Sequence, residues 1–345
     1  MLLEARDVQV RFPVRSRLTR QVVGELSAVA GVSIDVDEGG VLALVGESGS
    51  GKTTFARTVA GLQQVTSGEI RYRGQLLTGP GSKDRWRAVR REIQFVFQDP
   101  YSSLNPHRTA RQIVYEGLEV QRAGLTRREL RNTAASLLET VGISPDYADR
   151  YPHEFSGGER QRIGIARALA LHPRLLICDE PVSSLDVSVQ AQLLNLFREL
   201  RSKNGLAYLF ISHDLGVVQH VADTVAVMYL GKVVEQGPLE DVFARPRHPY
   251  SLALSSATPQ LRPWRGHHPG RVAMHADLPS PLRPPSGCRF RTRCWKATEL
   301  CASTEPVLAA AGTDQQVACH YPLAPSTTTS PGQVLEQAAT VQEHE

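Results

Sequence analysis

Four short, mainly apolar runs recur along the chain, separated by polar and glycine-rich stretches. Each is about as long as a strand and too short to form a helix of ordinary length. Apolar runs without polar alternation are typical of strands that are buried on both faces of a parallel sheet. They predict buried strands at residues 41–45, 93–97, 175–180 and 207–211.

A second kind of strand is indicated by apolar residues that alternate with polar ones. Val8, Val10 and Phe12 are spaced by two, which predicts a strand over residues 3–12. Further along we expect a basic loop at 15–20, a strand at 29–36, a strand and turn at 67–74, and a hairpin of 224–228 with 232–235 around Gly231.

Helices are expected between these strands, so the fold class is α/β with a mixed sheet. One segment carries a run of charged residues, 127–131, which we interpret as a solvated helix face. The expected helices lie at residues 54–60, 84–91, 109–145, 157–171 and 187–203.

Composition and charge exclude several classes of protein. The chain has 345 residues, 41% hydrophobic and 21% charged, which is globular composition. A net charge of +4 is too small to argue for nucleic acid as a partner. No apolar run approaches the roughly 18 residues of a membrane span, and the N-terminus lacks a signal-peptide pattern. We therefore expect a cytosolic protein whose five cysteines are reduced or bound to metal.

The first apolar run leads into a glycine-rich loop that fits the phosphate-binding pattern G-x-x-x-x-G-K-[ST]. A strand precedes the loop and a helix is expected after it, which is the context that the motif needs. Successive backbone N–H groups of such a loop point at phosphates, and the helix dipole adds positive potential. Lys52 would reach the β- and γ-phosphates, and Thr53 would place its hydroxyl on Mg²⁺. The motif residues are Gly46, Glu47, Ser48, Gly49, Ser50, Gly51, Lys52 and Thr53.

Two carboxylates end the apolar run that begins at residue 175. Ligands of an open α/β sheet gather at the carboxyl ends of its strands, where Asp179 and Glu180 are expected. Asp179 suits a contact with Mg²⁺ through water, and Glu180 is the candidate that polarises the attacking water. Cys178, inside the same run, is interpreted as a small core residue.

For three further residues, two of them polar and one aromatic, two interpretations remain open. Gln98 would coordinate Mg²⁺ or position water, or else only cap its strand. His213 would touch the γ-phosphate, or else have a structural role. Phe12 would stack on adenine, or else belong to the core.

A second glycine-containing turn, Ser156-Gly157-Gly158-Glu159, opens the helix expected at 157–171. Ser156 is a natural helix cap, and the paired glycines expose N–H groups at the helix end. Alone, the turn would be an ordinary cap. If it also binds phosphate, one chain carries two phosphate surfaces 110 positions apart, and a dimer that shares nucleotides at its interface would use both.

Taken together, these motifs resemble those of the ATP-binding subunits of ABC transporters. The motifs follow each other in the same order as in that family: the Walker A loop at 46–53, Gln98, the signature at 156–161, the Walker B strand at 175–180 and His213. The turn at Asp186 matches the D-loop of the family. Glu159 departs from the Gln that is more usual in the general family, and Ser-Gly-Gly-Glu-Arg-Gln looks normal in the peptide-importer branch.

The resemblance implies a P-loop core over residues 1–245 with a helical subdomain at about 99–165. It also implies a head-to-tail dimer that holds two ATP molecules between the Walker A loop of one chain and the signature of the other. Binding of ATP would close the dimer, and hydrolysis would open it. The implied ATP and Mg²⁺ contacts are Phe12, residues 46–53, Thr54, Gln98, residues 156–159 and Asp179, with Glu180, His213 and Gln98 as catalytic residues.

The remainder of the chain resembles the C-terminal extension of oligopeptide and dipeptide importer ATPases, a branch that includes nickel importers. Arg247-His248-Pro249-Tyr250-Ser251 carries this resemblance. It implies a small extension at 246–323. The tail at 324–345 is rich in Ser, Thr, Pro, Gln and Glu and is expected to be disordered.

Four cysteines cluster in this extension: Cys288, Cys294, Cys301 and Cys319, with gaps of five, six and seventeen residues. Four thiolates in a reducing compartment suit a 4Fe–4S cluster or a structural Zn²⁺, and free thiols are the third alternative. The short CxxC spacing of zinc ribbons is absent. The family resemblance favours the iron–sulfur cluster.

Two functions compete. The first is an ATPase subunit that energises an importer of di- or oligopeptides or a related small solute, peripheral to the cytoplasmic face of the membrane. This function implies three kinds of partner: a second, different ATPase chain, two membrane permeases and an extracytoplasmic solute-binding protein. It implies no nucleic acid. The alternative is a soluble ABC ATPase that acts on ribosomes or DNA, but such proteins usually carry two ATPase domains or large insertions.

Overall fold

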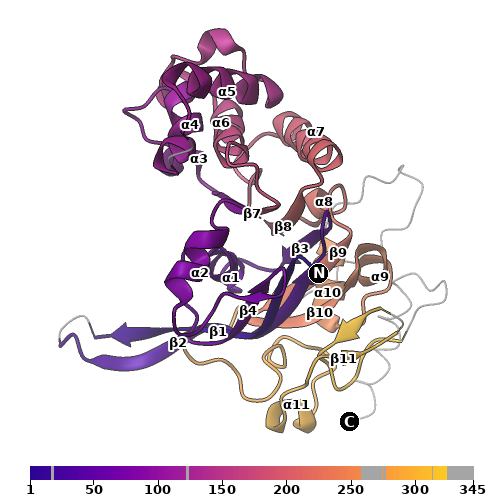
Figure 1. Ribbon diagram of the computed structural model, residues 1–345. Coiled ribbons are helices and arrows are strands. Elements are labelled where there is room, and N and C mark those ends of the chain that lie inside the picture. The colour runs from indigo at the N-terminus through magenta and orange to yellow at the C-terminus, as the bar shows by residue number, and fades with distance from the viewer. Residues whose placement is uncertain (17–18, 122–123, 258–273, 275–276, 313, 325–345) are drawn as a thin grey trace, which may run out of the picture.

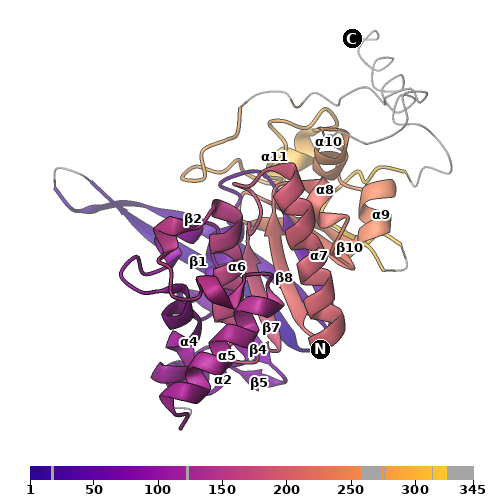
Figure 2. The same cartoon turned by 90° about the horizontal axis from the view of Figure 1, so that it is seen from above.

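Two sheets stacked in the middle of the molecule carry a helical lobe on one side and the C-terminal extension on the other. The computed structural model describes residues 1–16, 19–121, 124–257, 274, 277–312 and 314–324. Figure 1 shows the lobe of α3–α6 at the top and the extension, in gold, at the base. Figure 2 places the two on opposite sides as well. The tail expected to be disordered lies, from residue 325 on, outside the described residues.

The larger sheet has the strand order β11-β12-β10-β9-β3-β8-β7-β6. The pairs β6·β7, β7·β8, β8·β3 and β3·β9 are parallel, and β9·β10, β10·β12 and β11·β12 are antiparallel. The strands are β3 (Val41–Val45), β6 (Ile93–Val96), β7 (Leu175–Asp179), β8 (Ala207–Ser212), β9 (Thr224–Tyr229), β10 (Lys232–Pro238), β11 (Ala309–Ala310) and β12 (Gln316–Val317). The buried strands and the hairpin around Gly231 that the sequence predicts are confirmed.

Alternate residues of the parallel strands enter different cores. Leu176, Tyr208 and Phe210 pack into the core that the helical lobe shares with α7 (Val187–Asn204). Ile177 and Leu209 pack into the core below, between this sheet and the smaller one. Every residue of β3, β7 and β8 is buried because both faces of these strands are covered. Cys178 has no exposed surface, so its prediction as a core residue is confirmed.

The smaller sheet is antiparallel, with the order β2-β1-β4-β5. Its first two strands are longer than the sequence indicates and extend as an arm (Figure 1). In the outer half of β2, Val22 and Val23 are 60% and 66% exposed, so no buried face imposes an apolar alternation there. The strands are β1 (Leu3–Arg15), β2 (Val22–Val36), β4 (Ser67–Tyr72) and β5 (Gln75–Leu76).

The helices begin close to where the sequence predicts them. The arginine-rich helix is shifted by two residues, to α2 (Ser82–Val89), and the segment 109–145 contains two helices, each opened by a capping box at Thr109 or Thr126. The lobe contains α3 (Pro100–Ser103), α4 (Ala110–Val120), α5 (Arg127–Thr140), η1 (Pro145–Tyr147), η2 (Pro152–Glu154) and α6 (Gly157–Leu169). The others are α1 (Lys52–Val59), α8 (Leu215–Val218), α9 (Leu239–Ala244), α10 (Pro249–Ala257) and α11 (Glu299–Ser303).

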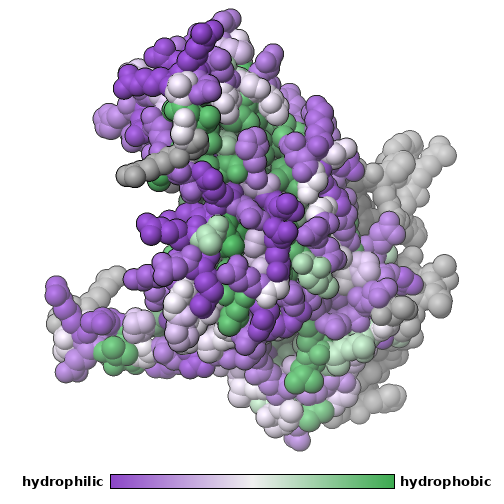
Figure 3. Space-filling view, in the orientation of Figure 1, coloured by the Kyte–Doolittle hydropathy of each residue, from purple (hydrophilic) through white to green (hydrophobic). Residues whose placement is uncertain are grey.

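Apolar side chains reach the surface of the helical lobe. Figure 3 shows them between polar side chains over α3–α6. Tyr101 is 67% exposed, Val120 76% and Tyr151 42%. No helix in the described part of the chain combines the length and the apolarity that crossing a bilayer requires.

The extension is attached to the larger sheet by pairing and by packing. Strand β12 pairs with β10 at Glu235 and Gln236. The rings of Tyr229, Tyr250 and Phe290 meet with centroids 4.7–5.4 Å apart, which joins β9 to α10 and to the segment before α11. Aromatic contacts of this kind bury large areas and have defined geometry. The extension therefore shares a core with the strands.

A buried carboxylate adds polar bonds to this attachment. Glu235 has no exposed surface and accepts hydrogen bonds from the backbone N–H groups of Arg247 at 2.7 Å and His248 at 2.9 Å. It also accepts one from the Gln315 side chain at 2.6 Å. Burial raises the pKa of Glu235, and these hydrogen bonds oppose the shift.

We expect Glu235→Ala to lower the free energy of unfolding by about 3 kcal/mol, because it leaves buried donors without an acceptor. Denaturant unfolding of the whole chain measures the change. Glu139→Ala, an exposed site on α5, is the control and should stay within about 0.5 kcal/mol of wild type. If the two variants unfold at the same midpoint, the carboxylate does not hold the extension in place.

Candidate active site

The loop between β3 and α1 has the strand, loop and helix context that its motif requires. Gly51 is the N-cap of α1, with φ of 103°. A Cβ atom at Gly51 would lie 2.1 Å from the carbonyl oxygen of Ala28, and one at Gly46 would lie 2.1 Å from that of Met228. The loop is thus pressed against β2 and the end of β9, and these two positions accept no side chain. The N-terminus of α1 opens toward the loop, which favours an anion there.

The ammonium group of Lys52 is held inside the loop. Lys52 is 4% exposed and donates to the carbonyl oxygens of Gly46 at 2.8 Å and Glu47 at 2.9 Å, and to the hydroxyl of Ser50 at 3.4 Å. Burial lowers the pKa of Lys52, and the nearby carboxylates of Glu180, Asp179 and Glu47 oppose that shift. A cation that is held by carbonyl oxygens can exchange them for the stronger acceptor oxygens of a phosphate.

Thr53 and Asp179 meet at the carboxyl end of β7. The Thr53 hydroxyl donates to Asp179 Oδ1 over 2.9 Å. Asp179 is 1% exposed, and burial raises its pKa, against which the bond from Thr53 and the charge of Arg57 act. A hydroxyl oxygen beside a buried carboxylate offers the hard oxygen ligands that Mg²⁺ prefers, so the two residues fit that ion.

Glu180 lies at the centre of a second cluster. Its Oε2 accepts a hydrogen bond from Gln98 Nε2 at 2.9 Å and lies 3.2 Å from His213 Nδ1. Glu180 has a left-handed backbone with φ of 46°, a conformation that costs energy for a side chain of this kind and is enriched at functional sites. The structure therefore brings together Gln98, Glu180 and His213, which the sequence places far apart.

Ser156, Gly157, Gly158 and Glu159 form the first turn of α6. Glu159 Oε2 accepts from the backbone N–H and the hydroxyl of Ser156, both at 2.8 Å, and its own N–H donates to that hydroxyl at 3.3 Å. This capping box accounts for an acidic residue at 159 by its local role. Within the described residues, no hydrogen bond or ion pair joins this turn to residues 46–53.

The remaining predicted contacts are less constrained. Ser48 and Gly49 are exposed at the tip of the loop, and Thr54 is half-buried in α1. Phe12 is half-buried on β1 and packs against the core between the sheets. A ring with one face on the core and one side exposed is compatible with both interpretations made from the sequence. Asp186 caps α7 by accepting from the Val189 N–H at 3.0 Å.

Sequence reasoning missed two residues of the extension that reach the loop. The backbone N–H of Glu47 donates to the hydroxyl of Tyr250 at 2.9 Å. Arg293 Nη1 lies 2.8 Å from Glu47 Oε2 and forms an ion pair with it. The contacts span 203 and 246 positions, and no spacing in the sequence marks them.

The predicted metal site of the extension is not supported. The five cysteines are free, and among the described residues no group of three or more His, Cys, Asp or Glu side chains could hold a metal ion. Burial raises the pKa values of Cys288, Cys294 and Cys319, that of Cys294 to about 12, so a metal ion would have to displace thiol protons on binding. The expectation of a 4Fe–4S cluster or Zn²⁺ thus gains no support from the geometry. A nearby residue that could also ligate a metal, His320, has its Nε2 atom 2.9 Å from the Thr304 carbonyl oxygen.

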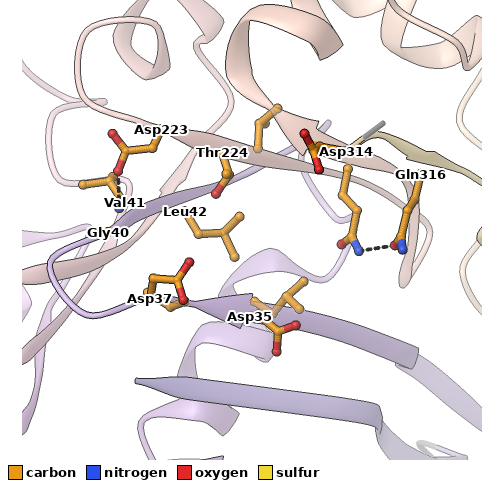
Figure 4. Close-up of a pocket in the computed structure, with 14 residues that line it drawn as sticks. Asp35, Asp37, Gly40, Val41, Leu42, Asp223, Thr224, Asp314 and Gln316 are labelled. Atoms are coloured by element: carbon orange, nitrogen blue, oxygen red, sulfur yellow. Dashed lines mark hydrogen bonds between the residues drawn. The ribbon is translucent and has the colours of Figure 1, made fainter. Parts of the chain in front are cut away.

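A cavity of about 280 Å³ lies elsewhere, between β2, β3 and β9 (Figure 4). It is reached from the start of β3, at Val41, whereas the glycine loop follows the other end of that strand. Four carboxylates line it, and they would repel phosphates. The figure shows the Asp223 carboxylate bonded to the Val41 N–H. This cavity is not the nucleotide site. Its acidic residues are Asp35, Asp37, Asp223 and Asp314.

Two family models match the chain, one on each functional part. The model described as ABC transporter matches residues 29–183. The model described as oligopeptide/dipeptide transporter, C-terminal region, matches residues 234–301. The first spans the glycine loop, the helical lobe and Glu180, and the second spans most of the extension up to Cys301.

Known proteins are similar to the chain over most of its length. The oligopeptide transport ATP-binding protein AppF of Bacillus subtilis is 47% identical over 319 residues, which are 92% of this chain and 97% of that protein. OppF of Escherichia coli, described by the same phrase, is 48% identical over 310 residues, covering 89% of this chain and 92% of that protein. Among solved structures, the dimeric ATP-binding cassette MJ0796 in a post-hydrolysis state with ADP and phosphate has a TM-score of 0.62 at 26% identity. The match covers 69% of this chain and 99% of the cassette.

Proposed function

Because the chain belongs to the ABC transporter family, we propose that it is the ATP-hydrolysing subunit that energises an importer of di- or oligopeptides or a related small solute. The observation that carries this proposal is the similarity to peptide-transport subunits across the cassette and the extension alike. A soluble ATPase that acts on ribosomes or DNA is not favoured, since the extension matches a transporter model.

The chain is an ATP hydrolase of the ABC type. We propose that the N–H groups of residues 46–54 and the ammonium group of Lys52 bind the β- and γ-phosphates. Lys52 would then exchange its hydrogen bonds to the carbonyl oxygens of Gly46 and Glu47 for bonds to the phosphates. Thr53, Asp179 and Gln98 would hold Mg²⁺, which neutralises phosphate charge when bound. The contact between Thr53 and Asp179 supports this assignment.

Glu180 is assigned to the attacking water. Its carboxylate is fixed through one oxygen by Gln98 and His213, which orients it at the end of β7. A fixed carboxylate can accept a proton from water as that water attacks the γ-phosphate. His213, 54% exposed, would position Glu180 and contact the γ-phosphate from the open side. We assign Phe12 to stacking on the adenine ring.

A second ATPase chain would complete each nucleotide site. The turn at 156–159 makes no described hydrogen bond or ion pair with residues 46–53, and we assign it to a nucleotide held by another chain. We propose a head-to-tail dimer with a second, different ATPase chain. This dimer closes when ATP binds and opens after hydrolysis.

Membrane partners follow from the same proposal. Two permease subunits would contact the cytoplasmic assembly, and an extracytoplasmic solute-binding protein would deliver the solute. The exposed apolar side chains of the helical lobe, Tyr101, Val120 and Tyr151, are suited to burial against such a partner. The chain would thus lie peripherally on the cytoplasmic face of the membrane.

The test is a gentle pull-down of the whole protein from native membranes, with mass spectrometry of its partners. We expect two multi-span permeases and a solute-binding protein, whose bound ligand names the solute. An untagged strain is the control. Ribosomal or DNA-repair proteins without any membrane protein would overturn the importer proposal and leave only the ATPase chemistry.

A further inference from the structure

We propose that Arg293 and Tyr250, both in the C-terminal extension, are positioning residues for the phosphate loop. They hold its first turn through Glu47 and thereby set the affinity of the site for ATP. This proposal rests on ATP hydrolysis by the chain and not on the identity of the transported solute.

The first contact is an ion pair in a largely desolvated place. Arg293 Nη1 lies 2.8 Å from Glu47 Oε2, and the two side chains are 8% and 23% exposed. Ion pairs at exposed positions contribute little, because water and side-chain entropy oppose them. Here the guanidinium is nearly enclosed, so the Glu47 carboxylate has a fixed partner and not a solvated one.

The second contact holds the backbone of the same residue. Tyr250 has no exposed surface, and its hydroxyl accepts the Glu47 N–H at 2.9 Å. Burial raises the pKa of Tyr250, so the hydroxyl stays neutral near pH 7. The ring is fixed in turn by Tyr229 and Phe290, at centroid distances of 4.7 and 5.4 Å. Glu47 is therefore gripped by its side chain and by its backbone.

The extension presents Arg293 from a rigid segment. The Arg293 N–H donates to the Phe290 carbonyl at 2.9 Å, and the Cys288 N–H donates to the Cys301 carbonyl at 2.8 Å. The Arg289 guanidinium donates to the Leu230 carbonyl, beside the turn that joins β9 to β10. The backbone that carries Arg293 is thus held in place beside the loop, so less backbone freedom is lost when the pair forms.

The need for this support arises from Lys52. In the structure its ammonium bonds the carbonyl oxygens of Gly46 and Glu47, which ties the loop together from inside. When Lys52 turns to phosphate, those two bonds are lost. The contacts from Arg293 and Tyr250 remain, so the loop keeps the shape in which its N–H groups converge on the phosphates. Preorganisation of this kind raises the affinity for ATP, because the loop is already ordered before ATP binds.

The test compares full-length variants in direct binding of a fluorescent ATP analogue and in steady-state hydrolysis. Arg293→Met keeps the aliphatic stem and removes the charge. We expect it to raise Kd and KM for ATP about tenfold and to leave kcat within about twofold, the effect of losing one charge-assisted hydrogen bond. Arg293→Lys should restore part of the affinity, and Tyr250→Phe should weaken ATP binding without loss of the ring packing.

The dependence on Glu47 is tested by a double-mutant cycle. Glu47→Gln should weaken ATP binding as Arg293→Met does, and the double variant should lose no more than either single variant. Arg291→Met is the matched control, since Arg291 lies in the same segment and donates to the Ser286 carbonyl at 3.0 Å instead of to the loop. It should bind ATP like wild type.

Two outcomes would overturn the proposal. One is a lower melting temperature of Arg293→Met with wild-type affinity for ATP, which would make Arg293 a structural attachment only. The other is an additive loss in the double variant, which would mean that Arg293 acts elsewhere than through Glu47. Both readouts use ATP alone, so a failure of the importer proposal would leave them unchanged.

Discussion

Glu180→Gln is expected to bind ATP normally and to hydrolyse it about 10²–10⁴-fold more slowly than wild type. The amide has the size of the carboxylate and can still accept from Gln98, now 2.9 Å from Glu180 Oε2. It cannot take a proton from water, which is the step assigned to Glu180. With hydrolysis blocked, the variant should accumulate a closed, ATP-bound dimer with the second ATPase chain proposed above. Phosphate release measures the rate, and size-exclusion chromatography with ATP measures the dimer.

Glu199→Gln is the matched control for this prediction. Glu199 is likewise a paired acid, with Lys203, but it is exposed and lies on helix α7, away from the nucleotide residues. Its replacement should leave phosphate release unchanged. Wild-type turnover in Glu180→Gln would show that another group polarises the water.

Gly51→Ala should abolish ATP binding and lower the free energy of unfolding by about 2–5 kcal/mol. The added Cβ would lie 2.1 Å from the Ala28 carbonyl oxygen, at a residue whose φ is 103°. Because a backbone atom on a paired strand cannot move aside cheaply, the loop itself must shift, and α1 begins directly after it. Nucleotide titration and denaturant unfolding without nucleotide measure the two effects.

Gly49→Ala separates backbone strain from collision. Gly49 also has a positive φ, of 79°, but a Cβ there would meet no atom within 4 Å. Without nucleotide, Gly49→Ala should lower the free energy of unfolding by only about 1–2 kcal/mol. If Gly51→Ala unfolds at the same midpoint as Gly49→Ala, the close approach to β2 is not what fixes the loop.

The parts of this fold that the sequence predicts well are those in which local pattern and tertiary environment agree. Strands β3, β7 and β8 are covered on both faces, so their apolar runs are unbroken. The glycine loop is equally readable, because a short stretch contains the backbone freedom, the cation and the hydroxyl that phosphate binding requires. Gln98, Glu180 and His213 follow strand ends, where the ligands of an open α/β sheet gather, and the structure places the three side chains together.

Other features depend on contacts that no local pattern encodes. The outer half of β2 is exposed, so its strand conformation comes from pairing with β1 and not from burial. Strand β12 is two residues long and is defined by its pairing with β10 and β11, which no local pattern marks. The pair of Arg293 with Glu47 joins residues 246 positions apart. The clustering of four cysteines predicted a metal site, but among the described residues no group of three or more His, Cys, Asp or Glu side chains could hold a metal ion.

The pairing of β12 with β10 has a consequence for anyone who wishes to shorten the protein. A chain that ends near residue 245 would contain every nucleotide motif, yet β10 would then be an uncovered sheet edge. Glu235 on that strand would also lose its donors from Arg247, His248 and Gln315. Unpaired edges are templates for association between chains. Such a cassette would be prone to aggregate on expression, so a soluble fragment has to keep the chain at least through Val317.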